Sequence, residues 1–414
     1  MGFMLSRTAV LRRSPALSSE CPHRIQTLQT KKLQSLIQDA MQNVPYLREV
    51  YRDAGISAAD ISTPADLVRL PAVTKQALRS VALEERLNQR FHPKELLTEQ
   101  SGGSTGEPFR VFMEKSYTRQ KNLRFLRGLL DAGYRPGQRM MLVTDRSAES
   151  GRANFGWHYC ALSRPTEDIA EDFLRVSPAI LYGCATPLRL LGDYLIENQI
   201  TFTPPRLVIT TAEALDRRAR SALQAAFGSP LADFYGLTEM GLVAWQRPHG
   251  NQYIMAHDSI LTEFVTDASG QGRYRMLMTN LDLRAMPLIR FDCGDIAMLN
   301  EQDNGQGLID IDGRAIDVIL TPAGKKISPY RITTALEEVR SLRRYKITQY
   351  DLDSLHVAIE TEDSDGGETT TRVKSALTAV LGPDVRIELE CSDQLVPQGT
   401  RKFRPVESRL TEHS

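Results

Sequence analysis

The chain has 414 residues, which is long enough for a sizeable core and for two domains. Its 51 basic and 51 acidic residues cancel, so the overall charge indicates neither nucleic acid nor a membrane surface as a partner. The 5 cysteines contain no CxxC pair, and no apolar run reaches the roughly 18 residues that a membrane helix needs. We therefore expect a cytoplasmic protein with reduced thiols and without a membrane span.

The N-terminal part is expected to be scaffold. Over residues 25–44 apolar side chains recur near one face of a helix, and Pro45 ends the pattern. Residues 66–75 carry little chemistry, and Lys75 is expected to be a solvated surface lysine. A short helix-forming run follows at residues 93–97.

A glycine-rich stretch, Glu99-Gln-Ser-Gly-Gly-Ser-Thr-Gly-Glu-Pro108, is the first segment with a chemical signal. Its glycines and hydroxyl side chains allow backbone N–H groups and hydroxyls to turn together towards an anion such as a phosphate. It is not a Walker loop, because Gly106 is followed by Glu107 and Pro108 instead of lysine and serine or threonine. By composition alone, a plain polar surface turn is the more common interpretation of such a cluster.

After this stretch, helical and strand periodicities alternate, which predicts parallel strands joined by crossover helices. The predicted helices cover residues 117–132, 188–199 and 215–227, and the predicted strands cover residues 139–144, 179–182, 207–211 and 231–235. Ligands of such sheets bind beyond the carboxyl ends of the strands. We therefore expect the ligand-binding residues at 181–187, 209–215 and 233–239, where predicted strands end.

The strand end Asp233-Phe-Tyr-Gly-Leu-Thr-Glu239 carries the second chemical signal. A carboxylate suits a divalent cation that bridges phosphates, an aromatic ring can cover a purine, and Gly236 allows a close backbone approach. Alternatively, Thr-Glu before an apolar run begins a helix. Upstream, Trp157 and His158 lie in an aromatic segment that predicts either a substrate pocket or a packed patch under a loop.

From residue 253 onwards, short strand patterns predict an antiparallel subdomain, with strands at 253–257, 260–265, 274–279 and 288–297. The last of these contains Gly294-Asp295, a pair that is also common in β-turns. The remaining pattern, with helices near 330–339 and 372–381, predicts a small α+β domain.

These segments, in this order, resemble the adenylate-forming enzymes, in particular the branch that contains phenylacetate-CoA ligase and its capsule-synthesis relatives. The resemblance implies a large layered α/β domain with an antiparallel β subdomain over residues 1–314, and a small, mobile α+β lid over residues 315–414. Residues 311–319 resemble the hinge between the two, which would pivot at Asp317. Gln398-Gly-Thr-Arg-Lys-Phe-Arg404 resembles the segment that carries the adenylation lysine, here Lys402.

The resemblance also implies roles for individual residues. Glu213 and Asp233 would face the adenine, Tyr235 would lie against the base, and Asp295 would accept hydrogen bonds from the ribose. The catalytic residues would be Lys402, Thr238 at the α-phosphate, and Glu239 at a magnesium ion. The full set of expected nucleotide contacts is Ser101, Gly102, Gly103, Ser104, Thr105, Gly106, Glu213, Asp233, Phe234, Tyr235, Gly236, Asp295 and Arg314. The expected acyl-pocket residues are Trp157, His158, Tyr182 and Gly183.

The activity implied by the resemblance is ATP- and Mg²⁺-dependent activation of an aryl or fatty acid to acyl-AMP, with transfer to a thiol, in the first place coenzyme A. Three positions depart from the family pattern: Glu107 and its surroundings lack a loop lysine, which Arg110 could replace, and Asp292 and Ile316 stand where other residues are usual. Two other classes stay open. One is an adenylating enzyme that serves an acyl carrier protein, an amine or a protein cysteine, and the other is a non-catalytic nucleotide-binding homologue. The sequence also leaves a homodimer open.

Overall fold

The structure is a computed structural model. It describes residues 22–100, 109–144, 151–152, 156–162, 164–213, 215–250, 252–266, 273–299, 308–314, 318–327, 329–337, 339, 341–361, 367–392, 395 and 404–410.

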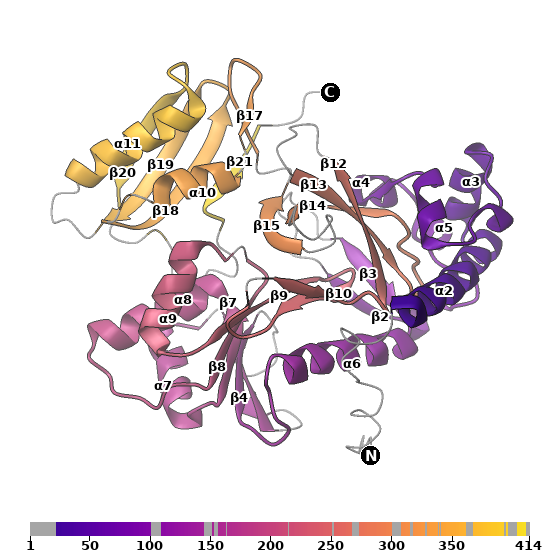
Figure 1. Ribbon diagram of the computed structural model, residues 1–414, viewed down its shortest axis with the longest axis horizontal. Coiled ribbons are helices and arrows are strands. Elements are labelled where there is room, and N and C mark those ends of the chain that lie inside the picture. Colours follow the sequence, from indigo (N-terminus) through magenta and orange to yellow (C-terminus); the bar gives the residue numbers. More distant parts are fainter. Residues whose placement is uncertain are drawn as a thin grey trace.

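A large, mostly parallel sheet forms the centre of the molecule (Figure 1). Within the described ranges its strand order is β11-β10-β9-β8-β7-β4-β6-β5. The strands are β4 (Met140–Thr144), β5 (Gly151–Arg152), β6 (Trp157–Ala161), β7 (Ile180–Cys184), β8 (Leu207–Thr211), β9 (Leu231–Leu237), β10 (Gly241–Gln246) and β11 (Tyr253–Met255). Neighbours from β6 through β4, β7 and β8 to β9 pair in parallel, as the alternating periodicities predict.

The expected antiparallel subdomain begins later than residue 253. β11 pairs with β10, and β10 pairs with β9, so both belong to the large sheet. Short spacing between strands predicts antiparallel neighbours, but it does not determine which sheet edge they join. The prediction for residues 253–257 was therefore wrong about the sheet.

Helices cover both faces of the large sheet and bury its apolar side chains. On one face, α7 (Thr166–Val176), α8 (Ala185–Glu197) and α9 (Arg217–Phe227) pack on a core that includes Leu181, Val208 and Leu231. On the other face, α6 (Lys115–Asp131) packs on a core that includes Ile209 and Phe234. Side chains at alternating positions of each strand point to opposite faces, which explains this division.

Local sequence signals set the two ends of α9. The Asp216 carboxylate accepts a hydrogen bond from the Ala219 N–H at 2.7 Å and so caps the N-terminus. Gly228 ends the helix with φ +61°, a left-handed conformation that glycine adopts without steric cost.

A second sheet and an N-terminal group of helices lie beside the large sheet (Figure 1). In the described part of the chain this sheet has the order β1-β14-β13-β12, and β15 also pairs with β14. The elements of this region are α2 (Pro22–Asn43), α3 (Pro45–Asp53), η1 (Ala58–Asp60), η2 (Pro64–Arg69), β1 (Val73–Thr74), α4 (Lys75–Arg79), α5 (Leu83–Arg86), η3 (Pro93–Glu95), β2 (Leu97–Gln100), β3 (Arg110–Met113), β12 (Ile260–Thr266), β13 (Arg273–Asn280), β14 (Phe291–Leu299) and β15 (Leu308–Arg314). β2 pairs with β3.

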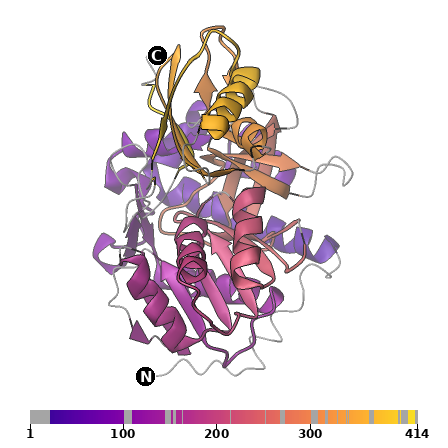
Figure 2. The ribbon, with the colours of Figure 1, turned by 90° about the vertical axis from the view of Figure 1, so that its left-hand side faces the viewer.

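The C-terminal part forms its own sheet, in the order β20-β19-β18-β21 among the residues described. Its elements are β16 (Ile319–Leu320), β17 (Lys326–Ile327), α10 (Pro329–Glu337), β18 (Leu342–Asp351), β19 (Ser354–Thr361), α11 (Gly367–Leu381), β20 (Arg386–Cys391) and β21 (Val406–Ser408). A separate apolar core, from Ile319 to Val406, holds them together. Figures 1 and 2 show this part, drawn in orange to yellow, above α8 and α9.

The predicted α/β class is confirmed, and the division into domains at residue 314 stays a prediction. None of the described helices combines the length and the apolar character that crossing a lipid bilayer requires.

Candidate functional site

The carboxyl end of β9 places Asp233 and Tyr235 on one face of the sheet. Asp233 is buried and accepts hydrogen bonds from the Thr210 hydroxyl, at 2.5 Å, and from the Tyr253 hydroxyl. The donors come from the neighbouring strand β8 and from β11, so two other strands fix the carboxylate. Burial raises the pKa of the Asp233 carboxyl, and the two hydroxyl donors offset that shift only in part.

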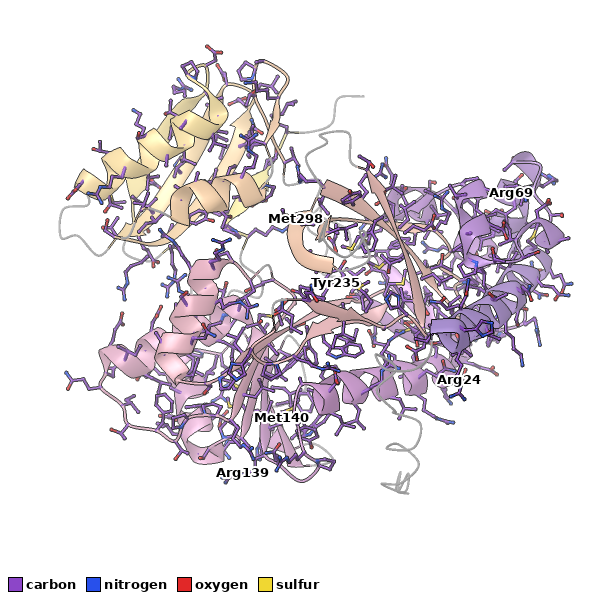
Figure 3. The ribbon with its side chains drawn as sticks, in the orientation of Figure 1. Arg24, Arg69, Arg139, Met140, Tyr235 and Met298 are labelled. Atoms are coloured by element: carbon purple, nitrogen blue, oxygen red, sulfur yellow. The ribbon has the colours of Figure 1, made fainter. Side chains whose placement is uncertain are left out.

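Tyr235 joins the large sheet to the second sheet. Its hydroxyl donates to Oδ2 of Asp295 on β14 at 2.7 Å, and both residues are buried. Figure 3 shows Tyr235 between the large sheet and the strand that carries Met298, which is β14. Burial and then the Asp295 charge raise the pKa of the Tyr235 phenol well above its usual value. The two segments with predicted nucleotide contacts are thus joined by one buried hydrogen bond.

Glu239, the expected magnesium ligand, lies in the turn between β9 and β10 and is 1% exposed. Its Oε1 lies 2.6 Å from Nζ of Lys75, whose side chain is 24% exposed. The contact is an ion pair without hydrogen-bond alignment, because Oε1 has no hydrogen-bond partner among the described residues. The prediction that Lys75 is a solvated surface lysine was wrong.

Long-range strand pairing brings Lys75 to this place. β1 pairs in parallel with β14, so that Val73 lies opposite Phe291 and Thr74 opposite Asp292. Lys75 follows directly and begins α4. One sequence signal could have identified Lys75 as a site residue, namely a cation at the end of a short strand. Strand ends in such sheets carry ligand-binding residues.

The two ends of the glycine-rich stretch lie near the turn that carries Glu239. Glu99 pairs with Val111, and Gln100 with Arg110, across β2 and β3, so the two ends of the glycine-rich stretch meet. Lys121 on α6 forms an ion pair with Glu99. The same side chain lies against Gly241, since a Cβ atom there would be 2.8 Å from Cγ of Lys121. Both loop ends therefore lie beside the turn that carries Thr238 and Glu239.

Glu213 occupies the N-terminus of α8. Its Oε2 accepts a hydrogen bond from the Thr186 N–H at 2.7 Å, which satisfies one of the free donors of that helix end. Glu213 and Thr186 also line a small cavity between the large sheet's helices and the C-terminal part. The other residues that line it are Ala185, Arg189, Asp216, Arg218, Ala219, Arg343, Arg344, Tyr345 and Pro405.

Two of the expected site glycines have packing reasons in the structure. A Cβ atom on Gly183 would lie 2.8 Å from the carbonyl oxygen of Val143 on β4. A Cβ atom on Gly236 would lie 3.0 Å from the carbonyl oxygen of Gly241. Close backbone approach inside the sheet thus accounts for both glycines, whatever they contact in a ligand.

The aromatic residues named for the acyl pocket lie in a packed cluster on the α6 face. Phe125 of α6 makes edge-on contacts with Trp157, Tyr182 and Phe234 at ring-centroid distances of 5.5–6.2 Å. The Trp157 indole N–H also donates to the Tyr134 hydroxyl at 3.1 Å. His158 follows on β6 and is half-buried. The packing interpretation agrees with this geometry, and a role in a substrate pocket stays a prediction.

Several predicted residues lie outside the described part of the chain, namely Ser101, Gly102, Gly103, Ser104, Thr105, Gly106, Glu107, Ile316, Asp317 and Lys402. For Arg314 the structure gives the backbone, which pairs with Asp295 in the β14–β15 ladder. Arg110, considered as a replacement for a loop lysine, is exposed on β3. Asp292 forms an ion pair with Arg275.

The donor set fits a magnesium ion bound together with a nucleotide. No group of three or more His, Cys, Asp or Glu side chains in the described ranges could hold a metal ion by itself. Mg²⁺ characteristically takes one or two carboxylates and completes its coordination with water and substrate phosphates. The buried Glu239 oxygen without a hydrogen bond meets that requirement.

No family model matches the chain. Phenylacetate-coenzyme A ligase of Escherichia coli (strain K12) is 23% identical over 387 residues, which cover 82% of this chain and 83% of the relative. Phenylacetate-coenzyme A ligase of Aromatoleum evansii is 22% identical over 405 residues, which cover 87% of each chain.

Among solved structures, 2-hydroxyisobutyryl-CoA ligase in the postadenylation state, in complex with 2-HIB-AMP, has a TM-score of 0.79 at 19% identity, covering 94% of this chain and 91% of that one. The same ligase in the thioesterification state, with 2-HIB-AMP and CoA, has a TM-score of 0.63 at the same identity and coverage. An anthranilate CoA ligase in complex with anthranoyl-AMP has a TM-score of 0.56 at 17% identity, covering 81% of this chain and 73% of that one.

The parallel sheet, the ordered series of motifs and these likenesses lead to one assignment. The sequence likeness to phenylacetate-CoA ligases and the likeness in fold to a solved CoA ligase support assigning the chain to the adenylate-forming enzyme superfamily.

Proposed function

We propose that the protein is an AMP-forming acid–thiol ligase, which activates an aryl or fatty acid with ATP and transfers the acyl group to coenzyme A. In the first half-reaction a carboxylate oxygen attacks the α-phosphorus of ATP, the bond to the bridging oxygen breaks, and pyrophosphate leaves. In the second, the thiol sulfur attacks the acyl carbon, loses its proton, and AMP leaves.

The observation that carries this proposal is the arrangement around β9. The Tyr235–Asp295 hydrogen bond unites two motif segments, and Glu239 with Lys75 lies at the turn where β9 ends. A buried carboxylate paired with a lysine is suited to a site that exchanges one cationic partner for another. Both ends of the glycine-rich loop lie beside that turn.

In this proposal each residue has a limited task, because the chemistry needs mainly positioning and charge neutralisation. Asp295 binds the ribose, and Asp233 and Glu213 face the adenine. Glu239 holds Mg²⁺, which would neutralise phosphate charge during the attack. Lys75, the partner of Glu239, would supply a positive charge that the loop lacks. Lys402 enters with the C-terminal part, which pivots near Asp317.

A carboxylate-dependent pyrophosphate-exchange assay tests the proposal. A panel of aryl and fatty acids is offered with ATP and Mg²⁺, and we expect exchange with at least one class of acid. Absence of both exchange and nucleotide-dependent acyl transfer, in protein that binds ATP, would support a non-catalytic homologue instead.

The acceptor needs a separate measurement. In protein that shows exchange, AMP release is followed with coenzyme A, with an acyl carrier protein or with an amine. Release that depends on coenzyme A supports the proposed ligase. Release that depends only on one of the other acceptors supports the second class of adenylating enzyme.

A further inference from the structure

The C-terminal part rests on α8 and α9 through charged and backbone groups. The central contact is Arg218 in the first turn of α9. Its Nη1 donates to the Leu342 carbonyl oxygen at 2.6 Å, and its Nη2 donates to the carbonyl oxygens of Leu336 and Val339, each at 2.5 Å. One side chain of the large sheet's helices thus holds three carbonyl groups of the C-terminal part.

Of these carbonyl groups, that of Leu336 belongs to the last turn of α10, whereas those of Val339 and Leu342 lie between α10 and the start of β18. The Leu336 and Val339 carbonyls also accept the N–H groups of Val339 and Leu342. α10 ends at Glu337, and the last carbonyls of a helix have no intrahelical donor. They also carry the negative end of the helix dipole, which a cation near the C-terminus stabilises. Arg218 supplies a donor to the last turn of α10 and a positive charge beside its C-terminal end, although it lies more than 100 residues away in the sequence.

A stripe on α8 makes the second set of contacts. Arg189, Asp193 and Glu197 are spaced by four residues and therefore share one helix face. Arg189 donates to the carbonyl oxygen of Arg343. Asp193 pairs with Arg344, and Glu197 pairs with Arg343 at 2.8 Å.

These contacts lose hydration when the parts meet. Burial lowers the pKa of the Arg189 guanidinium and raises the pKa of the Asp193 carboxyl, and both directions indicate a charged form that has lost water. For such groups the desolvation penalty offsets much of the gain from pairing. A surface of this kind can form and separate without a large net free energy.

We propose that Arg218 and the α8 stripe form a latch that holds the C-terminal part in the orientation for the first half-reaction and opens for the second. This proposal rests on the proposed function. The latch residues are positioning residues, since they bind backbone and side chains of the C-terminal part and no substrate. Here the latch is the set Arg189, Asp193, Glu197 and Arg218.

Two observations support this orientation. The likeness to one solved ligase is higher in its postadenylation state than in its thioesterification state, at equal identity and coverage, so the arrangement of parts accounts for the difference. In addition, Glu213, a predicted adenine contact, lines the same cavity as Arg343 and Arg344. The latched state therefore covers the adenine end of the candidate site.

The first test measures orientation without any substrate. Dyes are attached to Glu171→Cys on α7 and Lys374→Cys on α11, both exposed positions, in a background of Cys21→Ser and Cys391→Ser, and energy transfer gives their distance distribution. We expect one main population in the unmodified latch. Arg218→Ala and Asp193→Asn should each add a second population, and Arg218→Lys should have a smaller effect because one ammonium cannot reach three carbonyls.

Arg217→Ala is the matched control, since Arg217 is an exposed neighbour on the same helix. It should leave the distribution unchanged. If Arg218→Ala and Asp193→Asn, both shown to be folded by circular dichroism, keep the unmodified distribution, the latch is overturned. Asp193→Asn keeps the side-chain shape and provides the answer if Arg218→Ala does not fold.

The second test separates the half-reactions. Opening the latch should lower the ratio of pyrophosphate exchange to single-turnover acyl transfer from a prepared acyl-adenylate by about 10-fold, which corresponds to about 1.4 kcal/mol. An equal loss of both rates overturns the positioning role. A complete lack of exchange in the unmodified protein would count against the proposed function alone, because the distance measurement still decides the latch.

Discussion

On β9 and β14, the carboxylates of the candidate site are buried and accept hydrogen bonds from hydroxyl groups of other strands, with Asp233 and Asp295 only 4% and 6% exposed. On α8 and β18, the charged groups that hold the C-terminal part are more open, with 24% of the Asp193 side chain and 55% of the Glu197 side chain exposed. The first set joins strands within the large part through hydroxyl donors. The second joins two parts that each have their own apolar core.

The two sets of contacts differ in whether they must persist when the C-terminal part changes its orientation. A buried carboxylate that lost its hydroxyl donors would bear the full desolvation cost, so the β9–β14 contacts favour one fixed geometry. For partly exposed ion pairs the desolvation penalty offsets much of the gain from pairing, so the α8 contacts can be exchanged for water at little net cost in free energy. We therefore expect the β9–β14 side to serve both half-reactions and the C-terminal side to serve them unequally.

The largest expected effect is on the C-terminal side, which we expect to serve the two half-reactions unequally. Lys402→Ala should slow pyrophosphate exchange by about 100-fold to 1,000-fold, because a cation that neutralises charge between two anions is lost from the transition state. It should spare acyl transfer from a prepared acyl-adenylate, measured in a single turnover with coenzyme A. Arg401→Ala, from the same basic cluster, is the control. An equal fall of both rates would show that Lys402 does not serve the first half-reaction alone.

Asp295→Ala should produce the next largest effect, on the β9–β14 side of the site. The loss of a charge-assisted hydrogen bond to the ribose, of about 1.5–3 kcal/mol, should raise the Kd for ATP by about 10-fold to 150-fold. Both half-reactions should suffer alike, since the ribose is held in each. Calorimetry with ATP on the folded variant provides the measurement.

Two further variants sharpen the Asp295 result. Asp295→Asn keeps an acceptor for Tyr235 and loses the charge, so it should weaken ATP binding with little change in thermal stability. Tyr235→Phe keeps the charge and removes the donor. ATP affinity that stays unchanged in Asp295→Ala would remove Asp295 from the site.

The Lys75–Glu239 pair allows a test of whether a lysine holds the turn at the end of β9. Lys75→Met leaves a buried carboxylate without its cation, and we expect the free energy of unfolding to fall by about 1–3 kcal/mol. Lys75→Met combined with Glu239→Gln should recover part of that loss, because no unpaired charge remains. Lys94→Met, at an exposed position, is the control. Urea titrations of the four proteins give the comparison.

These residues also show what the sequence could and could not predict. Strand β8 was predicted at residues 207–211 and lies there, because a short apolar run between turn signals determines a buried strand locally. Lys75 was missed, since its partner depends on the pairing of β1 with β14, more than 200 residues apart. The resemblance assigned both Tyr235 and Asp295 to a nucleotide, but their mutual hydrogen bond follows only from how the two sheets meet.

The smallest expected effect concerns the charge of Asp233. Burial raises its pKa in the folded state above the value near 3.9 of an unfolded chain. A raised folded pKa means that the contribution of this group to stability is fully present below the unfolded pKa and is lost as the pH rises through the folded pKa. Above that range the carboxyl is charged in both states, and burying the charge makes the folded state less stable relative to the unfolded chain.

Asp233→Asn removes the titration and still offers an oxygen to the Thr210 and Tyr253 hydroxyls. Its melting temperature relative to the unmodified protein should therefore increase as the pH is raised from 4 towards neutrality, by thermal melts at matched ionic strength. A constant difference would show that the charge of Asp233 carries no penalty in the fold. The opposite trend would mean that the hydrogen bonds from the two hydroxyls stabilise the charged carboxylate by more than its burial costs. Charge would then stabilise the β9–β14 side of the site, as it does the contacts of the C-terminal part.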